Sequence, residues 1–124
     1  MTMPAIPFLD YCRIERVETP GEKPRFEVDA VAPLTNSRDA AHGGLLMTLL
    51  DVTMGQAVLA ETEGATSFAT MEMNVSFLRP GHGRVAATAT VLRTGRSVAF
   101  VESEVRDQAG VLVAKASGLF KPIF

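Results

Sequence analysis

The stretch that decides the fold is AHGGLLMTLLDVTMGQAVLA, residues 41–60, which is apolar over most of its length. A helix with apolar side chains on nearly every side belongs inside a domain rather than on its surface. We therefore expect a buried helix over residues 41–61. One carboxylate, Asp51, lies near its middle. Because an ionised carboxylate is costly to bury without partners, Asp51 is a candidate functional residue; a structural acid bonded to a neighbour is the alternative.

Four small or polar residues of this helix fall on one side. Gly44, Thr48, Asp51 and Gly55 are separated by four, three and four positions, which are helical spacings. We call these four residues the polar stripe. The polar stripe predicts a surface that another backbone or a ligand can approach closely.

The start of the helix is a candidate hydrogen-bond donor site. The first N–H groups of a helix lack intrahelical partners and lie at the positive end of its dipole. Gly43 and Gly44 leave these groups uncovered by side chains, so we expect them to donate to a carbonyl oxygen that develops negative charge. A facing carboxylate either attacks the carbonyl carbon or deprotonates a water that attacks it. The pairing predicts acyl transfer to water.

Helix geometry separates these groups within one chain. His42 and Asp51 are nine residues apart, which places them on opposite sides of the helix and about 13.5 Å apart along its axis. Gly44 and Asp51 share a side but lie about 10.5 Å apart. A two-fold dimer with antiparallel helices centred near Thr48 would bring Gly44 of one chain to Asp51 of the other. We therefore expect composite sites at an isologous interface.

The remaining segments are predicted to form strands. Alternating residues and turn signals place strands at 13–17, 25–31, 66–78, 84–92, 97–106 and 111–120, and residues 1–12 form a lead-in or a short helix. In the strand at 66–78, Met71, Met73, Val75 and Phe77 are expected on one face. One long helix followed by four antiparallel strands is an α+β pattern with the sheet wrapped on the helix. The 124 residues suit a single domain, 1–124.

Composition excludes several classes of partner. The formal net charge of −2 argues against nucleic acid, and the lone Cys12 indicates a reducing compartment. We find neither a leader-like N-terminus nor an apolar run of about 18 residues. The two histidines and Asp51 have no metal-ligand spacing. We expect a cytoplasmic protein that binds no nucleic acid, no membrane and no metal.

The motifs together resemble a known family. They are Asn36-(x5)-His42-Gly43-Gly44-(x6)-Asp51, the segment MEMNVSFLRPG at 71–81 and the segment GRSVAF at 95–100. Over about residues 7–121 the chain closely resembles the hotdog-fold acyl-CoA thioesterases of the phenylacetate-degradation (PaaI-like) type. The resemblance implies a helix wrapped by an antiparallel sheet, homodimers joined edge to edge and often homotetramers. It also implies hydrolysis of an acyl-CoA thioester, with no separate cofactor because CoA is part of the substrate.

The resemblance also implies roles for individual residues. Asp51 corresponds to the catalytic carboxylate, acting as general base or nucleophile, and Gly44 to the backbone donor to the thioester carbonyl. Asn36 and His42 correspond to groups that orient the thioester or the water, and Thr70 falls near a hydroxyl that assists catalysis in some relatives. His42 as a helix cap and Asn36 as a turn residue are the structural alternatives.

Two further points concern substrate binding and water positioning. CoA brings phosphates, and Arg93, Gly95, Arg96 and Ser97 offer two cations, a flexible backbone and a hydroxyl, with Arg79 as a further cation. In the family, this hairpin region commonly lines the nucleotide end of the CoA site. Some relatives carry a hydroxyl residue one turn beyond the carboxylate, where this chain has glycine.

Two other functions stay open on this fold. One is a non-catalytic module that binds acyl-CoA, for which a carboxylate near the thioester would have little use. The other is an enoyl-CoA hydratase, which needs a histidine and an acid placed for proton transfer at the α and β carbons. The spacing of His42 and Asp51 fits a hydratase poorly.

Overall fold

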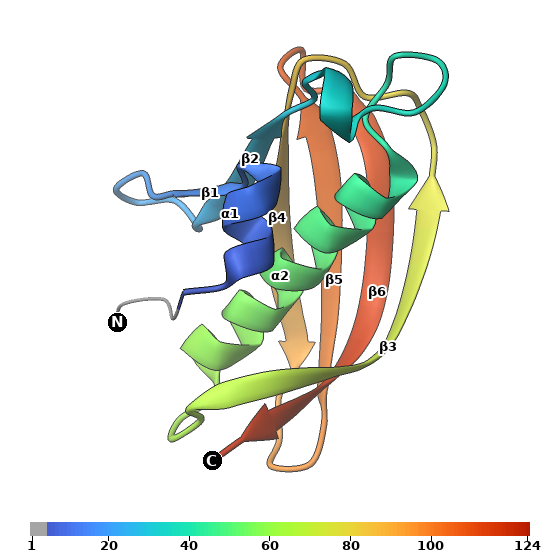
Figure 1. The fold of residues 1–124 in the computed structure, drawn as a ribbon. Helices are drawn as coiled ribbons and strands as arrows, with labels where there is room; N and C mark the ends of the chain where they lie inside the picture. Colours follow the sequence, from blue (N-terminus) through green and yellow to red (C-terminus); the bar gives the residue numbers. More distant parts are fainter. Residues whose placement is uncertain (1–4) are drawn as a thin grey trace.

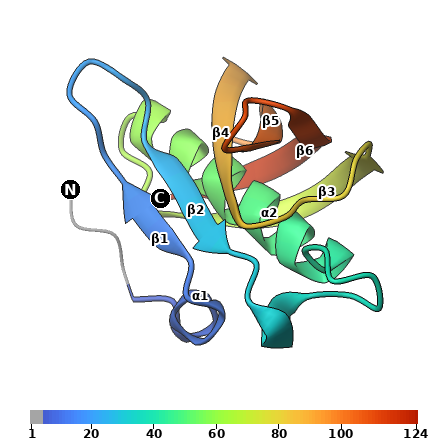
Figure 2. The ribbon, with the colours of Figure 1, turned by 90° about the horizontal axis from the view of Figure 1, so that it is seen from above.

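The computed structural model describes residues 5–124, so residues 1–4 of the expected lead-in lie outside the described part. Figure 1 shows one long helix, α2 (Gly43–Glu61), lying across a strongly curved antiparallel sheet. The strand order is β1-β2-β4-β5-β6-β3. Seen from above, the sheet wraps around α2 (Figure 2), which confirms the α+β hotdog architecture. The strands are β1 (Glu15–Val17), β2 (Arg25–Asp29), β3 (Ser67–Phe77), β4 (Arg84–Arg93), β5 (Ala99–Asp107) and β6 (Leu112–Ile123).

Helix α2 is the centre of the core, as its sequence predicts. Leu49, Leu50, Met54 and Val58 have no exposed surface, because the concave face of the sheet covers them. A short helix, α1 (Pro7–Cys12), and the 3₁₀ turn η1 (Ala32–Leu34) complete the fold. Burial of apolar surface of this extent is the main stabilising term of a small domain.

The same helix corrects one expectation about apolar segments. By length and composition alone α2 is long and apolar enough to cross a membrane, whereas no apolar run of about 18 residues was expected. In the fold, 61% of its most apolar window is buried. Because the sheet already covers these side chains, α2 has the character of the core helix of a domain.

A β-bulge in β3 corrects the predicted faces of that strand. Thr70 pairs with Phe120 and Glu72 pairs with Leu119, so Met71 is the extra residue. The predicted alternation put Met71 with Met73 on the core face, but Met71 is 58% exposed. Because the bulge inserts one extra residue, even-numbered side chains before it and odd-numbered side chains after it point to the same face, toward α2.

The last two hairpins also differ from prediction at their ends. The connection after β4 is longer than expected, so Ser97 lies in the loop and β5 begins at Ala99. Strand β6 continues to Ile123, three residues beyond the predicted end. Its pairing with β3 at Ser67 and Ile123 explains the extension, because that partner strand lies far away in sequence.

An ion-pair network joins β1, β2 and β4. Arg84 donates to Glu27 at 2.7 Å, to Glu15 at 3.1 Å and to Asp29 at 3.2 Å, and Arg25 donates to Glu27 at 2.9 Å. Burial opposes ionisation of Glu27, but the hydrogen bonds and charges of Arg84 and Arg25 outweigh it and lower its pKa. The pKa of Arg84 is raised, chiefly by its hydrogen bond to Glu27. The network ties the short β1–β2 hairpin to the main sheet.

Candidate active site

Asp51 is half-buried on α2 and forms a hydrogen bond with the edge strand. Thr70 Oγ1 donates to Asp51 Oδ1 at 2.6 Å. The two residues are 19 positions apart in sequence, and both stand among the predicted site residues. The contact holds one carboxylate oxygen in place, and the second is free of any hydrogen bond within residues 5–124. An ionised carboxylate held in this way can accept a proton from water or attack a carbonyl carbon.

The polar stripe is open over only part of its length. Thr48 donates its hydroxyl to the Gly44 carbonyl at 2.8 Å, within the helix. At the other end, Gly55 is fully covered by Phe68: a Cβ at Gly55 would lie 2.1 Å from Phe68 Cε2. The side chain at this position is therefore excluded by the Phe68 ring, which itself packs against Phe120 with centroids 6.0 Å apart. The accessible part of the stripe runs from Gly44 to Asp51.

The helix N-terminus differs from the expectation of uncovered amides. His42 is the N-cap of α2, and its Nδ1 accepts a hydrogen bond from the Gly44 N–H at 2.8 Å. The prediction that no side chain covers the Gly44 amide is therefore wrong for this chain taken alone. The reason is that an extended backbone at His42 brings its ring back over the first turn, as capping side chains do. Within residues 5–124 the Gly43 N–H has no such cap.

Asn36 organises the loop that leads into α2. Its Oδ1 accepts from the backbone N–H groups of Arg38 at 2.8 Å and Ala40 at 3.2 Å. This is the turn role that the sequence left as an alternative, and it uses the acceptor atom of the amide. The Nδ2 donor of Asn36 is not engaged by any residue in the described range.

An open groove of ≈ 590 Å³ lies beside the start of α2. Asn36, Gly43, Phe77 and Arg79 contribute to its walls. The groove therefore combines amide donors, an exposed aromatic ring and a cation at one place. Asp51 is not among its lining residues, as the helix geometry predicts for groups of one chain.

The residues predicted to bind CoA fall in two places. Arg93, Gly95, Arg96 and Ser97 are exposed around the β4–β5 loop, where Thr94 contacts Thr62 at the C-terminal end of α2. Arg79 lies in the groove at the opposite end and donates to the Leu112 carbonyl at 3.0 Å. The 19-residue helix between them is about 28 Å long. The structure does not bring Arg79 together with the other four residues in one chain.

Phe68 is part of the site, although it is not among the predicted catalytic residues. Its ring covers Gly55, the last residue of the polar stripe. A glycine inside a long helix is unfavourable by about 1 kcal/mol relative to alanine. Gly55 therefore signals that another group approaches the helix backbone at that turn.

Comparisons with known proteins agree with this architecture. The profile of the thioesterase superfamily matches residues 39–114. A Pseudomonas aeruginosa structure is similar at 31% identity with a TM-score of 0.85, covering 96% of this chain and 95% of the other. A Bacillus halodurans protein solved with CoA is similar at 27% identity with a TM-score of 0.91, covering 97% and 80%. The Escherichia coli PaaI protein, at 21% identity with a TM-score of 0.84 over 96% and 86%, shares the fold.

Sequence relatives carry names of the same kind. A Saccharolobus solfataricus protein described as an esterase is 36% identical over 93 residues, 74% of this chain. The medium/long-chain acyl-CoA thioesterase YigI of E. coli is 28% identical over 93 residues, 64% of this chain. The matches span 66% and 60% of the length of these two relatives.

One long central helix with a curved antiparallel sheet around it defines the hotdog fold. The match over residues 39–114 covers more than half of the chain. The chain belongs to the thioesterase superfamily.

Proposed function

We propose that the protein hydrolyses an acyl-CoA thioester to the free acid and CoA. The observation that carries the proposal is the Asp51 carboxylate, held at one oxygen by Thr70 and otherwise open on the polar stripe. The thioesterase family and the acyl-CoA thioesterase relatives support thioester hydrolysis. The CoA in the B. halodurans structure supports CoA as the leaving group.

The proposed chemistry uses one water. Asp51 accepts a proton as the water oxygen adds to the thioester carbonyl carbon, and the oxyanion is stabilised by amide donors. The intermediate then expels the CoA sulfur, which receives a proton, and the carboxylic acid is released. Direct attack by Asp51 through a mixed anhydride is the alternative route, with water then cleaving the anhydride.

We propose a homodimer that completes this site. Strand β3 is at the edge of the sheet and 11 residues long, and such an edge offers unpaired backbone groups for another strand. The apolar side chains of Met71 and Phe77 on β3 and of Met47 on α2 are exposed. Pairing of two β3 edges around a two-fold axis would cover these side chains and place the α2 N-terminus of each chain near Asp51 of the other.

In this arrangement the donors come from the partner. Gly44, as predicted, serves as a donor once the His42 ring turns away from its amide, and Gly43 needs no such movement. Asn36 Nδ2 and His42 orient the thioester or the water. The acyl group lies along the open part of the stripe, and the Phe68 ring closes the stripe at Gly55. The CoA phosphates bind Arg93 and Arg96, whose loop lies beyond the C-terminal end of α2.

Activity assays test the proposal directly. Thiol release over a panel of aryl and alkyl acyl-CoA substrates measures turnover, and Asp51→Asn should lower kcat by about 10²–10⁴-fold. Thermal melting checks that the variant folds. We expect it to fold, because Asp51 is only half-buried and does not hold the core together. Near-normal turnover of Asp51→Asn would show that Asp51 is structural.

Subunit mixing tests whether the site is composite. A dimer formed from Asp51→Asn and His42→Ala chains has one site with both residues intact, so a randomised mixture should recover about a quarter of wild-type activity. The control mixture is Asp51→Asn with Thr70→Val. Because Asp51 and Thr70 meet within one chain, this mixture should recover nothing beyond its parents. Recovery in neither mixture would overturn the composite site.

The two other functions make different predictions. A binding module would hold acyl-CoA tightly without releasing thiol. A hydratase would consume an enoyl-CoA without thiol release, and its product would absorb less at the enoyl wavelength. The Asp51–Thr70 pair favours hydrolysis, because the threonine leaves one carboxylate oxygen available for water. We further propose a cytoplasmic protein.

A further inference from the structure

Three segments meet at the end of the molecule where α2 ends. They are the turn between α2 and β3, the β4–β5 loop and residue Phe124 after β6, and Figure 1 shows all three at the same end of the fold. Thr62 and Thr94 join the first two segments through a hydroxyl contact of 2.5 Å. Arg96 and Phe124 join the last two, because the guanidinium carbon of Arg96 lies 4.1 Å from the centre of the Phe124 ring. A residue proposed to bind CoA therefore contacts a side chain far away in sequence.

The Phe124 ring is held beside the turn between α2 and β3. The carbonyl of the preceding residue, Ile123, accepts a hydrogen bond from the Thr66 N–H at 2.7 Å. The ring lies next to Gly64, since a Cβ at Gly64 would lie 3.7 Å from Phe124 Cδ1, which is ordinary van der Waals contact. Phe124 is nevertheless 44% exposed. Because a ring exposed to this extent adds little to the core, its specific partner is the Arg96 cation.

The N–H donors of Arg96 are free of protein partners in the described part of the chain. Glu61 and Glu63 lie at the end of α2 and in the turn that follows, yet Arg96 forms no ion pair or hydrogen bond with them or with any other residue of 5–124. A phenyl ring has no oxygen or nitrogen that accepts a hydrogen bond. The attraction between cation and ring face therefore holds the guanidinium and leaves its planar fork available for an anion.

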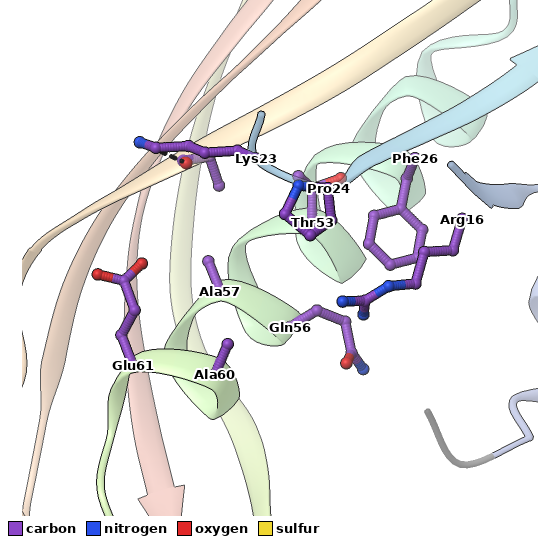
Figure 3. A pocket seen from close by; sticks show the side chains of 10 residues that line it. Arg16, Lys23, Pro24, Phe26, Thr53, Gln56, Ala57, Ala60 and Glu61 are labelled. Carbon is purple, nitrogen blue, oxygen red and sulfur yellow. Dashed lines mark hydrogen bonds between the residues drawn. The ribbon is translucent and has the colours of Figure 1, made fainter. Parts of the chain in front are cut away.

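The arginine–aromatic contact of the β1–β2 hairpin has a different character. Figure 3 shows Arg16 beside the Phe26 ring, and its guanidinium carbon lies 5.8 Å from the ring centre. Arg16 Nε donates to Glu18 at 2.8 Å, and Phe26 is buried in the core. In that contact the charge is already paired and the ring has a packing role. The contact between Arg96 and Phe124 is closer and has neither property.

We propose that Phe124 is a positioning residue that holds Arg96 ready for a phosphate of CoA. The inference deepens the proposed function, because it rests on binding of the CoA phosphates by the β4–β5 loop. An exposed arginine loses side-chain freedom when it binds an anion, and this loss weakens binding. A ring that orders the guanidinium before CoA arrives reduces the loss. Because the loop lies beyond the C-terminal end of α2, Phe124 affects the affinity for CoA rather than the chemical step.

Calorimetric titration of the whole protein with CoA tests the proposal. Phe124→Leu keeps an apolar side chain beside Gly64 but removes the ring face, so the Kd of CoA should rise by about two- to fivefold, the size of one exposed cation–π contact. Phe124→Tyr should restore the wild-type Kd. Pantetheine, which lacks the phosphates, should bind all three proteins equally. Phe100→Leu is the matched control, because Phe100 is 42% exposed and is not the ring under Arg96.

A double-mutant cycle separates positioning from packing. In the Arg96→Met background, Phe124→Leu should cause no further rise in the Kd of CoA, whereas in the Arg93→Met background it should cause its full rise. Pentafluorophenylalanine in place of Phe124 keeps the shape of the ring but removes its negative face, so it should weaken CoA binding as Phe124→Leu does. A ring with only a packing role would not respond to fluorination.

The outcomes separate this inference from the proposed function. An unchanged Kd of CoA in Phe124→Leu, an equal rise in both arginine backgrounds or no response to fluorination would overturn the positioning role. Because CoA binding is measured without turnover, a wild type that shows the expected binding pattern but releases no thiol would support the role of Phe124 and contradict hydrolysis. A wild type that binds no CoA would overturn both.

Discussion

Thr70 Oγ1 donates a 2.6 Å hydrogen bond to Asp51 Oδ1, and the bulge in β3 is what makes this contact possible. With strict alternation, Thr70 would face away from the side of β3 that carries Met73. The extra residue, Met71, restores Thr70 to the face that looks at α2. β-Bulges commonly re-aim a side chain next to a functional site.

Removal of the Thr70 hydroxyl should slow turnover. Thr70→Val keeps the shape of the side chain but leaves Asp51 Oδ1 without its donor, so we expect kcat to fall by about tenfold, the equivalent of one hydrogen bond. Thr70→Ser should restore most of the loss. A Thr70→Val enzyme with wild-type kcat would show that the contact does not position the carboxylate.

Substitution of His42 separates capping from catalysis. His42→Ala removes the Nδ1 acceptor of the Gly44 N–H and should cost about 1 kcal/mol of stability. His42→Asn keeps a capping side chain, so its urea midpoint should stay near that of the wild type. If the imidazole acts on the thioester, both variants lose turnover; if His42 only caps α2, His42→Asn stays active.

A double-mutant cycle tests the packing of Phe68 on Gly55. Gly55→Ala gains about 1 kcal/mol of helix propensity, but its Cβ overlaps the Phe68 ring, and overpacking costs about 1–3 kcal/mol. We expect Gly55→Ala to destabilise the wild type and to stabilise Phe68→Ala, as measured by urea unfolding. Additive effects would contradict the overlap.

The contact between Phe68 and Gly55 also predicts how the enzyme ranks acyl chains of different size. Because the Phe68 ring closes the polar stripe one turn beyond Asp51, Phe68→Ala opens space at that point. Its kcat/KM should rise for bulkier acyl-CoA substrates relative to the smallest one. An unchanged ranking across the panel would place the acyl group elsewhere.

The β4–β5 loop is predicted to bind the CoA phosphates. Arg93→Met and Arg96→Met together should raise KM for acyl-CoA by at least tenfold with a smaller change in kcat, because the phosphates lie far from the bond that breaks. A truncated pantetheine thioester should show no such rise. Arg106→Met is the control, since Arg106 is also exposed but pairs with Glu104.

Glu27 makes the stability of the β1–β2 hairpin depend on pH. Because Arg84 and Arg25 lower its pKa in the folded state, its contribution is complete above the unfolded value of about 4.3 and is lost as the pH falls through the folded value. Glu27→Gln should destabilise the protein by about 1.5 kcal/mol at pH 7. The difference from wild type should shrink below about pH 4, as followed by urea unfolding.

Much of the fold follows from local sequence patterns. The apolar residues around α2 require an interior position, and the alternation in β2, β4, β5 and β6 requires strands that cover it. The separation of His42 and Asp51 follows from helix geometry alone. Asp51 and Thr70 stand out as candidates, but sequence gives no distance between them.

The sequence by itself determined a buried helix with one carboxylate, because hydrophobic burial and helical spacing are read from neighbouring residues. Only the tertiary structure decided what that carboxylate contacts. The β3 bulge turns Thr70 to Asp51, the Phe68 ring occupies the space at Gly55, and the His42 ring caps Gly44. The separation of Arg79 from the β4–β5 loop was likewise set by the length of α2. Each of these depends on strand register or side-chain direction, which contacts between distant segments fix and local propensity does not.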